Sequence, residues 1–306
     1  MAKVFITGAN GFIGTHLCQY FDKNKVSYKA GVRKAQKATE VSYGDLTTRE
    51  DWSALLQGCD QIVHLAARAH VMQENLLDPL VAYLKINMES TIKLARSAQE
   101  NGIKKFIFLS SIKVNGERTL PGQRFKADDP TKPTDAYANS KLRTEVELLK
   151  MHQPGRFEIV IIRPPLVYGG DVKGNLKSLF KIVKWQIPLP FAKVNNQRSL
   201  VSVYNVCDLI MTCLRKSEAA GQIFLVSDDH DLSLRTLILQ ISKILKRPVL
   251  LLPVPLSWIY FVAKLFKKES YTDRLLGNLQ VDIEKTKTTL SWKPPFTFEQ
   301  TFQIKS

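Results

Sequence analysis

The feature that most constrains this chain is a glycine-rich turn close to its N-terminus. An apolar run over residues 4–7 leads directly into Gly8, Gly11 and Gly14, and a helix-like segment follows over residues 15–21. In such a unit the first glycine permits the tight turn, the second lets backbone approach a pyrophosphate, and the third lets the helix pack against the strand. The helix N-terminus then offers free N–H groups to phosphate. Any tight turn could carry glycines, but the flanking strand and helix favour a dinucleotide-binding turn.

Strand-like and helix-like segments alternate through the first half of the chain. We expect strands at residues 4–7, 28–32, 62–65, 106–110 and 159–162, and helices at 12–21, 75–100 and 136–150. This alternation predicts an α/β fold, a Rossmann doubly wound parallel sheet with helices on both faces. Such sheets bind ligands beyond the carboxyl ends of their strands. The motifs that end these strands should therefore meet in one crevice.

From Pro164 onward the pattern loosens into segments punctuated by proline and glycine. We expect an NAD(P)-binding Rossmann domain over residues 1–165, to which the chain returns around residues 199–227. Residues 166–306 should form mainly a smaller C-terminal lobe that binds a substrate. The length of 306 residues is sufficient for both parts.

The chain is strongly basic, with a formal net charge of +16. Its lysines are scattered and no pattern of stacking aromatics accompanies them, so we expect no nucleic-acid partner. An anionic substrate and an anionic membrane surface explain the charge equally well. The most apolar run, residues 248–266, contains two further prolines and a lysine, so we expect no transmembrane segment and at most a weak peripheral membrane contact.

Cysteine usage indicates a reducing compartment. The four cysteines form no C-x-x-C pair, which predicts a cytoplasmic protein with reduced thiols and no metal site. The first strand begins almost at the N-terminus, so we expect no signal peptide.

A serine, a tyrosine and a lysine form the candidate catalytic set. Ser111 ends an expected strand, and Tyr137 and Lys141 lie one turn apart at the start of the next helix, which Asp135 or Thr134 should cap. We expect the ammonium group to lower the tyrosine pKa and make a general acid/base usable near neutrality, while the serine holds the substrate oxygen. A second Y-x-x-x-K pair, Tyr260 and Lys264, follows no serine-bearing strand and should be unrelated to catalysis.

The residues after the second expected strand bear on the choice of cofactor. NAD-binding Rossmann domains place an acid there for the ribose hydroxyls, whereas this chain has Arg33 and Lys34. A basic pair suits the 2′-phosphate of NADP, so we expect NADPH to be preferred, with NAD possible. Arg33 could alternatively be a solvated residue at a strand end.

Matching motifs extend over nearly the whole chain. They are Thr7-Gly8 to Gly14, Gly44-Asp45-Leu46, His64-Leu65-Ala66-Ala67, Asn87, Ser110-Ser111, Tyr137 with Lys141, Arg163-Pro164 and Val167-Tyr168-Gly169. With them the chain resembles the extended short-chain dehydrogenases/reductases, the NAD-dependent epimerase/dehydratase family that modifies nucleotide sugars. The resemblance implies a UDP-sugar substrate, and we expect a homodimer.

The resemblance also implies roles for individual residues. Ser111, Tyr137 and Lys141 are the catalytic set. The expected cofactor-binding residues are Gly8, Asn10, Gly11, Phe12, Ile13, Gly14, Arg33, Lys34, Asp45, Leu46, Ala66, Ala67, Asn87, Tyr137, Lys141 and Pro164. The expected substrate-binding residues are Arg68, Ser111, Lys113, Asn175, Leu176, Arg198 and Arg274. Arg198 is similar to the arginine that pairs with the diphosphate, although a surface ion pair would explain it too, and Lys113 could contact the substrate or be solvated.

Departures from the family pattern narrow the expected reaction. Sugar 4,6-dehydratases carry an Asp-Glu pair after the catalytic hydroxyl, whereas Ile112 and Lys113 follow Ser111 here, so dehydration is not expected. The run from Ser110 to Gly116 is most similar to bacterial reductases of UDP-4-keto-6-deoxy-N-acetylhexosamines that serve surface polysaccharide synthesis. We therefore expect an NADPH-dependent 4-keto reductase. A UDP-sugar 4-epimerase with bound NAD is the alternative, and a non-catalytic cofactor-sensing protein is a more distant one.

Overall fold

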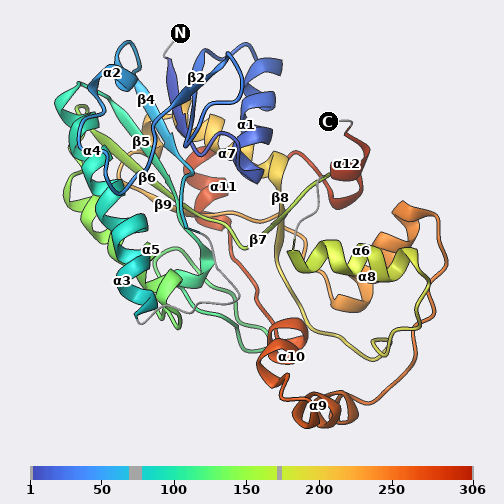
Figure 1. Cartoon of the computed structure of the whole chain (residues 1–306). Helices are drawn as coiled ribbons and strands as arrows, with labels where there is room; N and C mark the ends of the chain where they lie inside the picture. The colour runs from blue at the N-terminus through green and yellow to red at the C-terminus, as the bar shows by residue number, and fades with distance from the viewer. Residues whose placement is uncertain (1–2, 69–77, 171–173, 305–306) are drawn as a thin grey trace.

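The centre of the structure is a seven-stranded sheet in which every pair of neighbouring strands is parallel (Figure 1). The computed structural model describes residues 3–68, 78–170 and 174–304. The strands are β1 (Val4–Thr7), β2 (Tyr28–Val32), β3 (Glu40–Ser42), β4 (Gln61–His64), β5 (Lys105–Leu109), β6 (Glu158–Arg163) and β9 (Ile223–Leu225). Their order is β3-β2-β1-β4-β5-β6-β9, so the direction of winding changes between β1 and β4. This is the predicted doubly wound sheet, and the change of direction marks its ligand-binding edge.

The strands of the sheet contribute side chains to two separate cores. In β5, Ile107 and Leu109 belong to the core on one face, and Phe106 and Phe108 belong to the core on the other. Strands buried on both faces are apolar at every position, which is why they stand out in the sequence. Full burial of a large apolar side chain contributes roughly 1.5–3 kcal/mol, so these two cores hold the sheet and its helices together.

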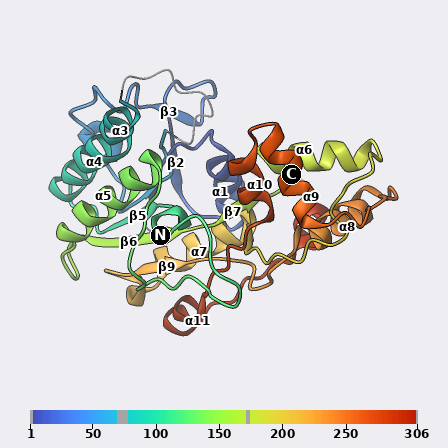
Figure 2. The same ribbon diagram turned by 90° about the horizontal axis from the view of Figure 1, so that it is seen from below.

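Helices cover both faces of the sheet (Figures 1 and 2). One face carries α1 (Phe12–Lys23), α7 (Val203–Arg215) and α11 (Glu284–Leu290), and the other carries α2 (Ser53–Leu56), α4 (Ser90–Glu100) and α5 (Ala136–Lys150). The helix expected over residues 75–100 is found as α3 (Pro79–Tyr83), a π-helical turn (Leu84–Glu89) and α4 in direct succession; residues 75–77 lie outside the described ranges. Short 3-10 turns occur at Ile112–Val114 and Ser217–Ala219.

The remaining elements form a smaller lobe beside the sheet (Figure 2). It contains the two-stranded parallel pair β7 (Leu166–Tyr168) and β8 (Leu200–Ser202), and the helices α6 (Gly174–Lys184), α8 (Leu234–Leu245), α9 (Leu256–Leu265), α10 (Glu269–Leu276) and α12 (Phe298–Gln303). Its own core includes Tyr168, Leu200, Ile238 and Phe298. We propose that this lobe binds the substrate, and that residues 1–165 together with the returning segment 199–227 bind the cofactor.

Within the described part of the chain, no helix is both long and apolar enough to cross a membrane.

Candidate functional site

The glycine turn between β1 and α1 is built so tightly that side chains would not fit. Gly8 has a φ of +69°, and a Cβ atom there would lie 2.8 Å from the backbone nitrogen of Ala66. A Cβ on Gly14 would lie 2.1 Å from the carbonyl oxygen of Gly8. The first and third glycines are therefore required by the close contact of strand, turn and helix, which leaves the α1 N-terminus at the sheet edge.

Replacing Gly14 by alanine is expected to abolish cofactor binding. The added methyl group would force α1 away from the turn, because the atoms it meets are backbone and cannot rotate aside. The matched control is Gly170→Ala, since a Cβ at Gly170 meets nothing within 4 Å. Titration of NADH and NADPH by protein fluorescence checks the pair. Cofactor binding by Gly14→Ala equal to that of Gly170→Ala would contradict this account of the turn.

A crevice of about 700 Å³ opens at the carboxyl ends of β1, β2 and β4. Its lining combines the glycine turn, the segment after β3, the loop after β4 and the π-helical turn. The lining residues are Gly8, Asn10, Gly11, Arg33, Tyr43, Gly44, Asp45, Leu46, Thr47, Leu65, Ala66, Ala67, Arg68, Ala82, Lys85 and Ile86. Eight of the sixteen expected cofactor-binding residues thus line one cavity, and its position and glycine turn fit a dinucleotide. Sequence reasoning missed Tyr43, Thr47 and Lys85, because the chain reaches the crevice there outside the known motifs.

An ion pair occupies the crevice wall where the cofactor ribose would be selected. The guanidinium of Arg33 donates to Asp45 Oδ2 at 2.9 Å, although twelve residues separate them. The other Asp45 oxygen accepts hydrogen bonds from the backbone and hydroxyl of Thr47, and these bonds lower the pKa of the carboxyl. Arg33 is thereby oriented across the wall of the crevice, and Asp45 partly offsets its charge.

Asn87 fixes the loop that follows β4. Its side-chain oxygen accepts from the backbone N–H of Arg68 at 2.8 Å, and its amide donates to the Arg68 carbonyl at 3.2 Å and to Ser140 Oγ at 3.0 Å. The buried amide therefore connects the crevice wall to α5. These bonds give Asn87 a positioning role, and the direct cofactor contact expected from the sequence stays a prediction. Pro164 is likewise buried, and its carbonyl accepts from the N–H of Ile112.

The three candidate catalytic residues meet where β5 ends and α5 begins. Asp135 caps α5, with Oδ1 accepting from the N–H of Ala138 at 2.7 Å, so Tyr137 lies in the first turn. A side-chain hydrogen bond links Tyr137 to Ser111. Lys141 is buried, and its ammonium donates to the carbonyl of Leu109 at 2.8 Å and lies 6.0 Å from the centre of the Tyr137 ring. The structure thus brings together residues from the strand end and the helix start.

The pKa of Tyr137 differs from the expectation. Burial and, to a smaller extent, the Asp135 carboxylate raise it to about 12, and the hydrogen bond with Ser111 acts in the opposite direction. Burial also lowers the pKa of Lys141 to about 7. The expected effect of the ammonium on the tyrosine is therefore outweighed by desolvation of both groups, which disfavours their charged forms.

Lys113 has a role that neither sequence-based alternative anticipated. Its ammonium lies 2.5 Å from Asp135 Oδ2, and both side chains are partly buried. The pair joins the turn after Ser111 to the N-cap of α5. Lys113 therefore holds the serine and the tyrosine segments in register and is neither freely solvated nor aimed away from the protein.

Two buried networks behind the site were not predicted as functional. His64 bridges Thr7 Oγ1 at 2.7 Å and Thr91 Oγ1 at 2.8 Å, and burial lowers its pKa to about 3, so it is a neutral crosslink between β1, β4 and α4. Arg163 and Glu145 form a buried ion pair at 2.6 Å. His64 and Arg163 stand in motifs of the sequence, but only the folded chain shows which residues they bridge.

The expected substrate-binding residues of the lobe differ in burial and in their partners. Arg198 Nη1 donates to the carbonyls of Arg274 at 2.8 Å and Gly277 at 3.0 Å. Burial lowers its pKa, and no carboxylate among the described residues forms an ion pair with it. The side chain of Arg274 is exposed and pairs with Glu117 at 3.4 Å. Leu176 is packed into the lobe core, and the side chain of Asn175 lies outside the described part.

The chain that follows Ser111 runs against this part of the lobe. The N–H groups of Thr119 and Phe125 donate to the carbonyls of Asn278 and Gln280. Arg198 and the Ser111 segment are therefore connected through the same short stretch, residues 277–281.

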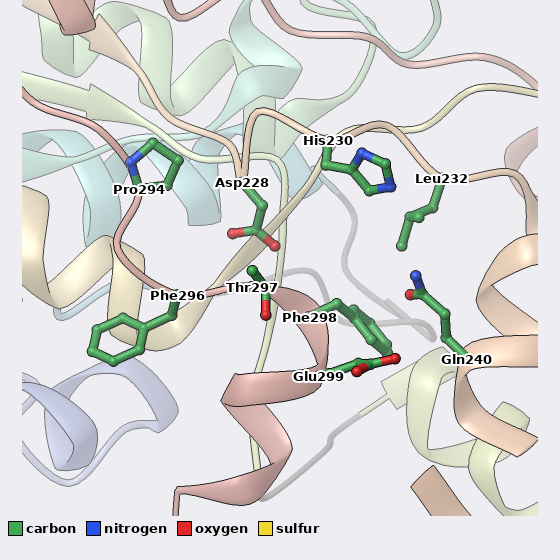
Figure 3. A pocket seen from close by; sticks show the side chains of 9 residues that line it. All are labelled: Asp228, His230, Leu232, Gln240, Pro294, Phe296, Thr297, Phe298 and Glu299. Atoms are coloured by element: carbon green, nitrogen blue, oxygen red, sulfur yellow. The ribbon is translucent and has the colours of Figure 1, made fainter. Parts of the chain in front are cut away.

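A second cavity, of about 400 Å³, lies between the segment after β9, helix α8 and the start of α12 (Figure 3). Asp228 lies in its wall together with His230, Gln240 and Phe298. Both Asp228 oxygens already accept hydrogen bonds, from Tyr168 at 2.5 Å and from Ser202 and Asn205 at 2.8 and 2.7 Å. Burial raises the Asp228 pKa to about 6. The carboxyl group joins the lobe to the sheet domain, and this cavity lacks the glycine turn and the catalytic set.

The chain belongs to the NAD dependent epimerase/dehydratase family, whose sequence pattern matches residues 4–227. The family uses a nicotinamide dinucleotide, as the crevice and glycine turn indicate.

Individual relatives extend this assignment over the whole chain. A UDP-glucose 4-epimerase of Vibrio cholerae is 44% identical over 98% of this chain and 93% of its own length. The structure of MoeE5 in complex with UDP-glucose and NAD superimposes with a TM-score of 0.77 at 18% identity, covering 99% of this chain and 96% of that one. RMD from Pseudomonas aeruginosa, complexed with NADPH, gives 0.76 at 19%, covering 99% and 97%. At these identities the two structures establish the shared fold.

Proposed function

We propose that this protein is a 4-epimerase of UDP-hexoses. The observation that carries the proposal is the 44% identity with the Vibrio cholerae UDP-glucose 4-epimerase over nearly the whole chain. The cluster of Ser111, Tyr137 and Lys141 beside the crevice supports it, because both oxidation and reduction at C4 need an acid/base at one oxygen. This proposal reverses the order expected from the sequence, in which the 4-keto reductase came first.

The residues of the site divide the proposed chemistry among them. A bound nicotinamide supplies the hydride acceptor and donor for C4. Tyr137 takes the proton of the 4-hydroxyl and returns it to the same oxygen, and Ser111 holds that oxygen by a hydrogen bond. Lys141 places positive charge next to the tyrosine when it is protonated. The 4-keto sugar must stay bound at the partly buried Tyr137 while it turns to present its other face to the nicotinamide.

A 4-keto reductase remains the second candidate because Arg33 lies on the crevice wall. A basic residue there suits NADPH, which reductases draw from an exchangeable pool. The absence of an acidic pair after Ser111 continues to disfavour a dehydratase. The homodimer and the cytoplasmic location remain predictions from the sequence.

The amount of cofactor consumed per molecule of sugar converted tests the proposal. Purified protein is incubated with UDP-glucose or UDP-N-acetylglucosamine and a trace of NAD, and the nucleotide sugars are separated by chromatography. We expect the C4 epimer to accumulate in large excess over the added cofactor, with no net change in reduced nicotinamide. Failure to convert either sugar, together with NADPH oxidation on addition of a UDP-4-keto-6-deoxy sugar, would establish the reductase instead.

Arg198→Ala is expected to raise the KM for a UDP-sugar by about one to two orders of magnitude and to change kcat less. The half-buried guanidinium lacks an ion-pair partner among the described carboxylates, and a diphosphate would supply the missing charge. Arg235→Ala, an exposed arginine on α8, is the control. Steady-state kinetics on both variants decides the point, and an unchanged KM in Arg198→Ala would leave Arg198 as a structural residue.

For the second candidate, the reductase, we propose that Arg33 sets a preference for NADPH over NADH. Replacing it by aspartate is expected to reverse the preference, with NADPH affinity falling about tenfold or more because a second carboxylate beside Asp45 repels the 2′-phosphate. Lys37→Asp changes the same charge outside the crevice lining and is the control. Dissociation constants for both cofactors provide the measurement. Equal affinities in the unaltered protein would remove Arg33 from cofactor selection.

A further inference from the structure

Helix α9 carries a row of large apolar side chains that face solvent. Trp258, Phe261 and Leu265 are 66%, 68% and 71% exposed, and Phe266, just after the helix, is 67% exposed. Positions 258, 261 and 265 are three and four residues apart, so they share one side of the helix. We call these four residues the α9 apolar face. Ile259 and Ala263, on the opposite side, pack onto the lobe and hold the helix in place.

This face is too large and too aromatic to be an accident of surface composition. Soluble monomers scatter single apolar residues over their surface, whereas contiguous patches mark sites of interaction. The helix lies at the outer edge of the lobe, with α10 between it and the rest of the molecule in Figure 1. It is therefore accessible to a broad, flat partner.

The stretch of chain that carries the α9 apolar face is strongly basic, and the acids that follow it, Glu269 and Asp273, lie on α10, where Asp273 pairs with Arg118 at 3.9 Å. Residues 232–268 contain seven lysines and arginines and no aspartate or glutamate, and this stretch includes the whole of α8 and α9. Lys264, Lys267 and Lys268 are exposed, and none of them forms an ion pair with a described carboxylate. Lys246 and Arg247, at the end of α8, are exposed as well. A local excess of cations beside exposed aromatics favours an anionic partner.

We propose that α9 docks this protein onto an anionic lipid bilayer, lying in the plane of the interface. Apolar side chains on one side of a short helix with lysines at their border are the pattern of interfacial helices. Aromatic side chains such as Trp258 settle at headgroup depth, where the lysines meet lipid phosphates. The ten residues of α9 are too few to span a bilayer, so it binds on the surface.

A second copy of this chain fits the face less well than a membrane does. A symmetric contact through α9 would bring Lys264, Lys267 and Lys268 of both copies towards one another, against only Glu269 and the already paired Asp273 of the adjoining α10. Like charges oppose such a contact, whereas an anionic bilayer neutralises them. The basic border therefore selects the bilayer over self-association.

Sedimentation with lipid vesicles tests the proposal on the full chain. We expect binding to vesicles of phosphatidylcholine with phosphatidylglycerol, and at least a tenfold lower affinity for phosphatidylcholine alone or in high salt. Phe261→Ser with Leu265→Ser, and separately Lys264→Gln with Lys267→Gln and Lys268→Gln, should each reduce binding on the order of tenfold. Val81→Ser, which alters an exposed side chain on α3, should bind as the unaltered protein does.

Tryptophan fluorescence gives a readout that does not depend on the stability of these variants. In a Trp185→Phe background the exposed tryptophan is Trp258, because Trp52 and Trp292 are buried. Anionic vesicles should shift its emission to the blue. Equal binding to neutral and anionic vesicles, or an unshifted emission, would overturn the proposal. So would oligomers in solution that dissociate when Phe261 and Leu265 are replaced, since the face would then belong to a second copy.

Discussion

Replacing Tyr137 by phenylalanine is expected to reduce turnover about 10²- to 10⁴-fold while cofactor affinity stays within a few-fold of its original value. The substitution removes the one hydroxyl that we assign to proton transfer and leaves the ring, which contacts Tyr83, in place. The hydroxyl is not part of the glycine turn or the crevice lining, so cofactor binding should persist. Steady-state kinetics and cofactor titration on the same preparation separate the two effects.

The chain supplies its own control for this experiment. Tyr260 is followed by Lys264 at the same spacing, but both lie on α9 at the edge of the lobe. Tyr260→Phe should therefore leave kcat and KM close to their original values. Loss of turnover in Tyr260→Phe with retention in Tyr137→Phe would place the active site elsewhere.

Lys141→Met is expected to lower turnover by at least two orders of magnitude and at the same time to stabilise the cofactor-free protein by about 1–3 kcal/mol near pH 7. Burial lowers the pKa of Lys141 from 10.5 to about 7, so holding this lysine inside the fold costs free energy whenever it is charged in the unfolded chain. The folded state binds fewer protons than the unfolded state between these values. The cost of burying Lys141 is therefore absent above about pH 10, and it grows as the pH falls towards 7.

Denaturant unfolding across pH checks this prediction. The stability gain of Lys141→Met should be largest at pH 7 and below, and it should shrink as the pH rises towards 10. Lys264→Met, at an exposed lysine, should change neither stability nor turnover. A Lys141→Met protein that is less stable than the original at pH 7 would show that the hydrogen bond to Leu109 outweighs the desolvation of the ammonium.

The sheet was predictable because its strands are buried on both faces. Each of the five expected strands ends within one residue of its observed position, since runs such as residues 106–108 are apolar at every position. The short strands β3, β7 and β8 have no such run, and pairing with a neighbour defines them. Their existence follows from the folded chain and not from local pattern.

The site was predictable where a motif fixes backbone geometry and less so where charges interact at long range. The glycine turn and the i, i+4 spacing of Tyr137 and Lys141 follow from local rules. Asp135, one of the two residues expected to cap α5, is its N-cap. The contacts of Lys113 with Asp135 and of Arg33 with Asp45 join segments that the sequence leaves separate. The raised pKa of Tyr137 depends on burial, which no short motif specifies.

The central claim, that one site oxidises C4 and reduces it again, is tested most directly with UDP-glucose carrying deuterium at C4. Nuclear magnetic resonance and mass spectrometry follow the label while unlabelled free cofactor is present. We predict UDP-galactose that retains deuterium at C4, with none in the free cofactor, because the keto sugar stays bound beside Tyr137 and Ser111 until the same hydride returns. Deuterium released to free cofactor, or UDP-glucose left unconverted while a 4-keto sugar is reduced at the expense of NADPH, would contradict the account.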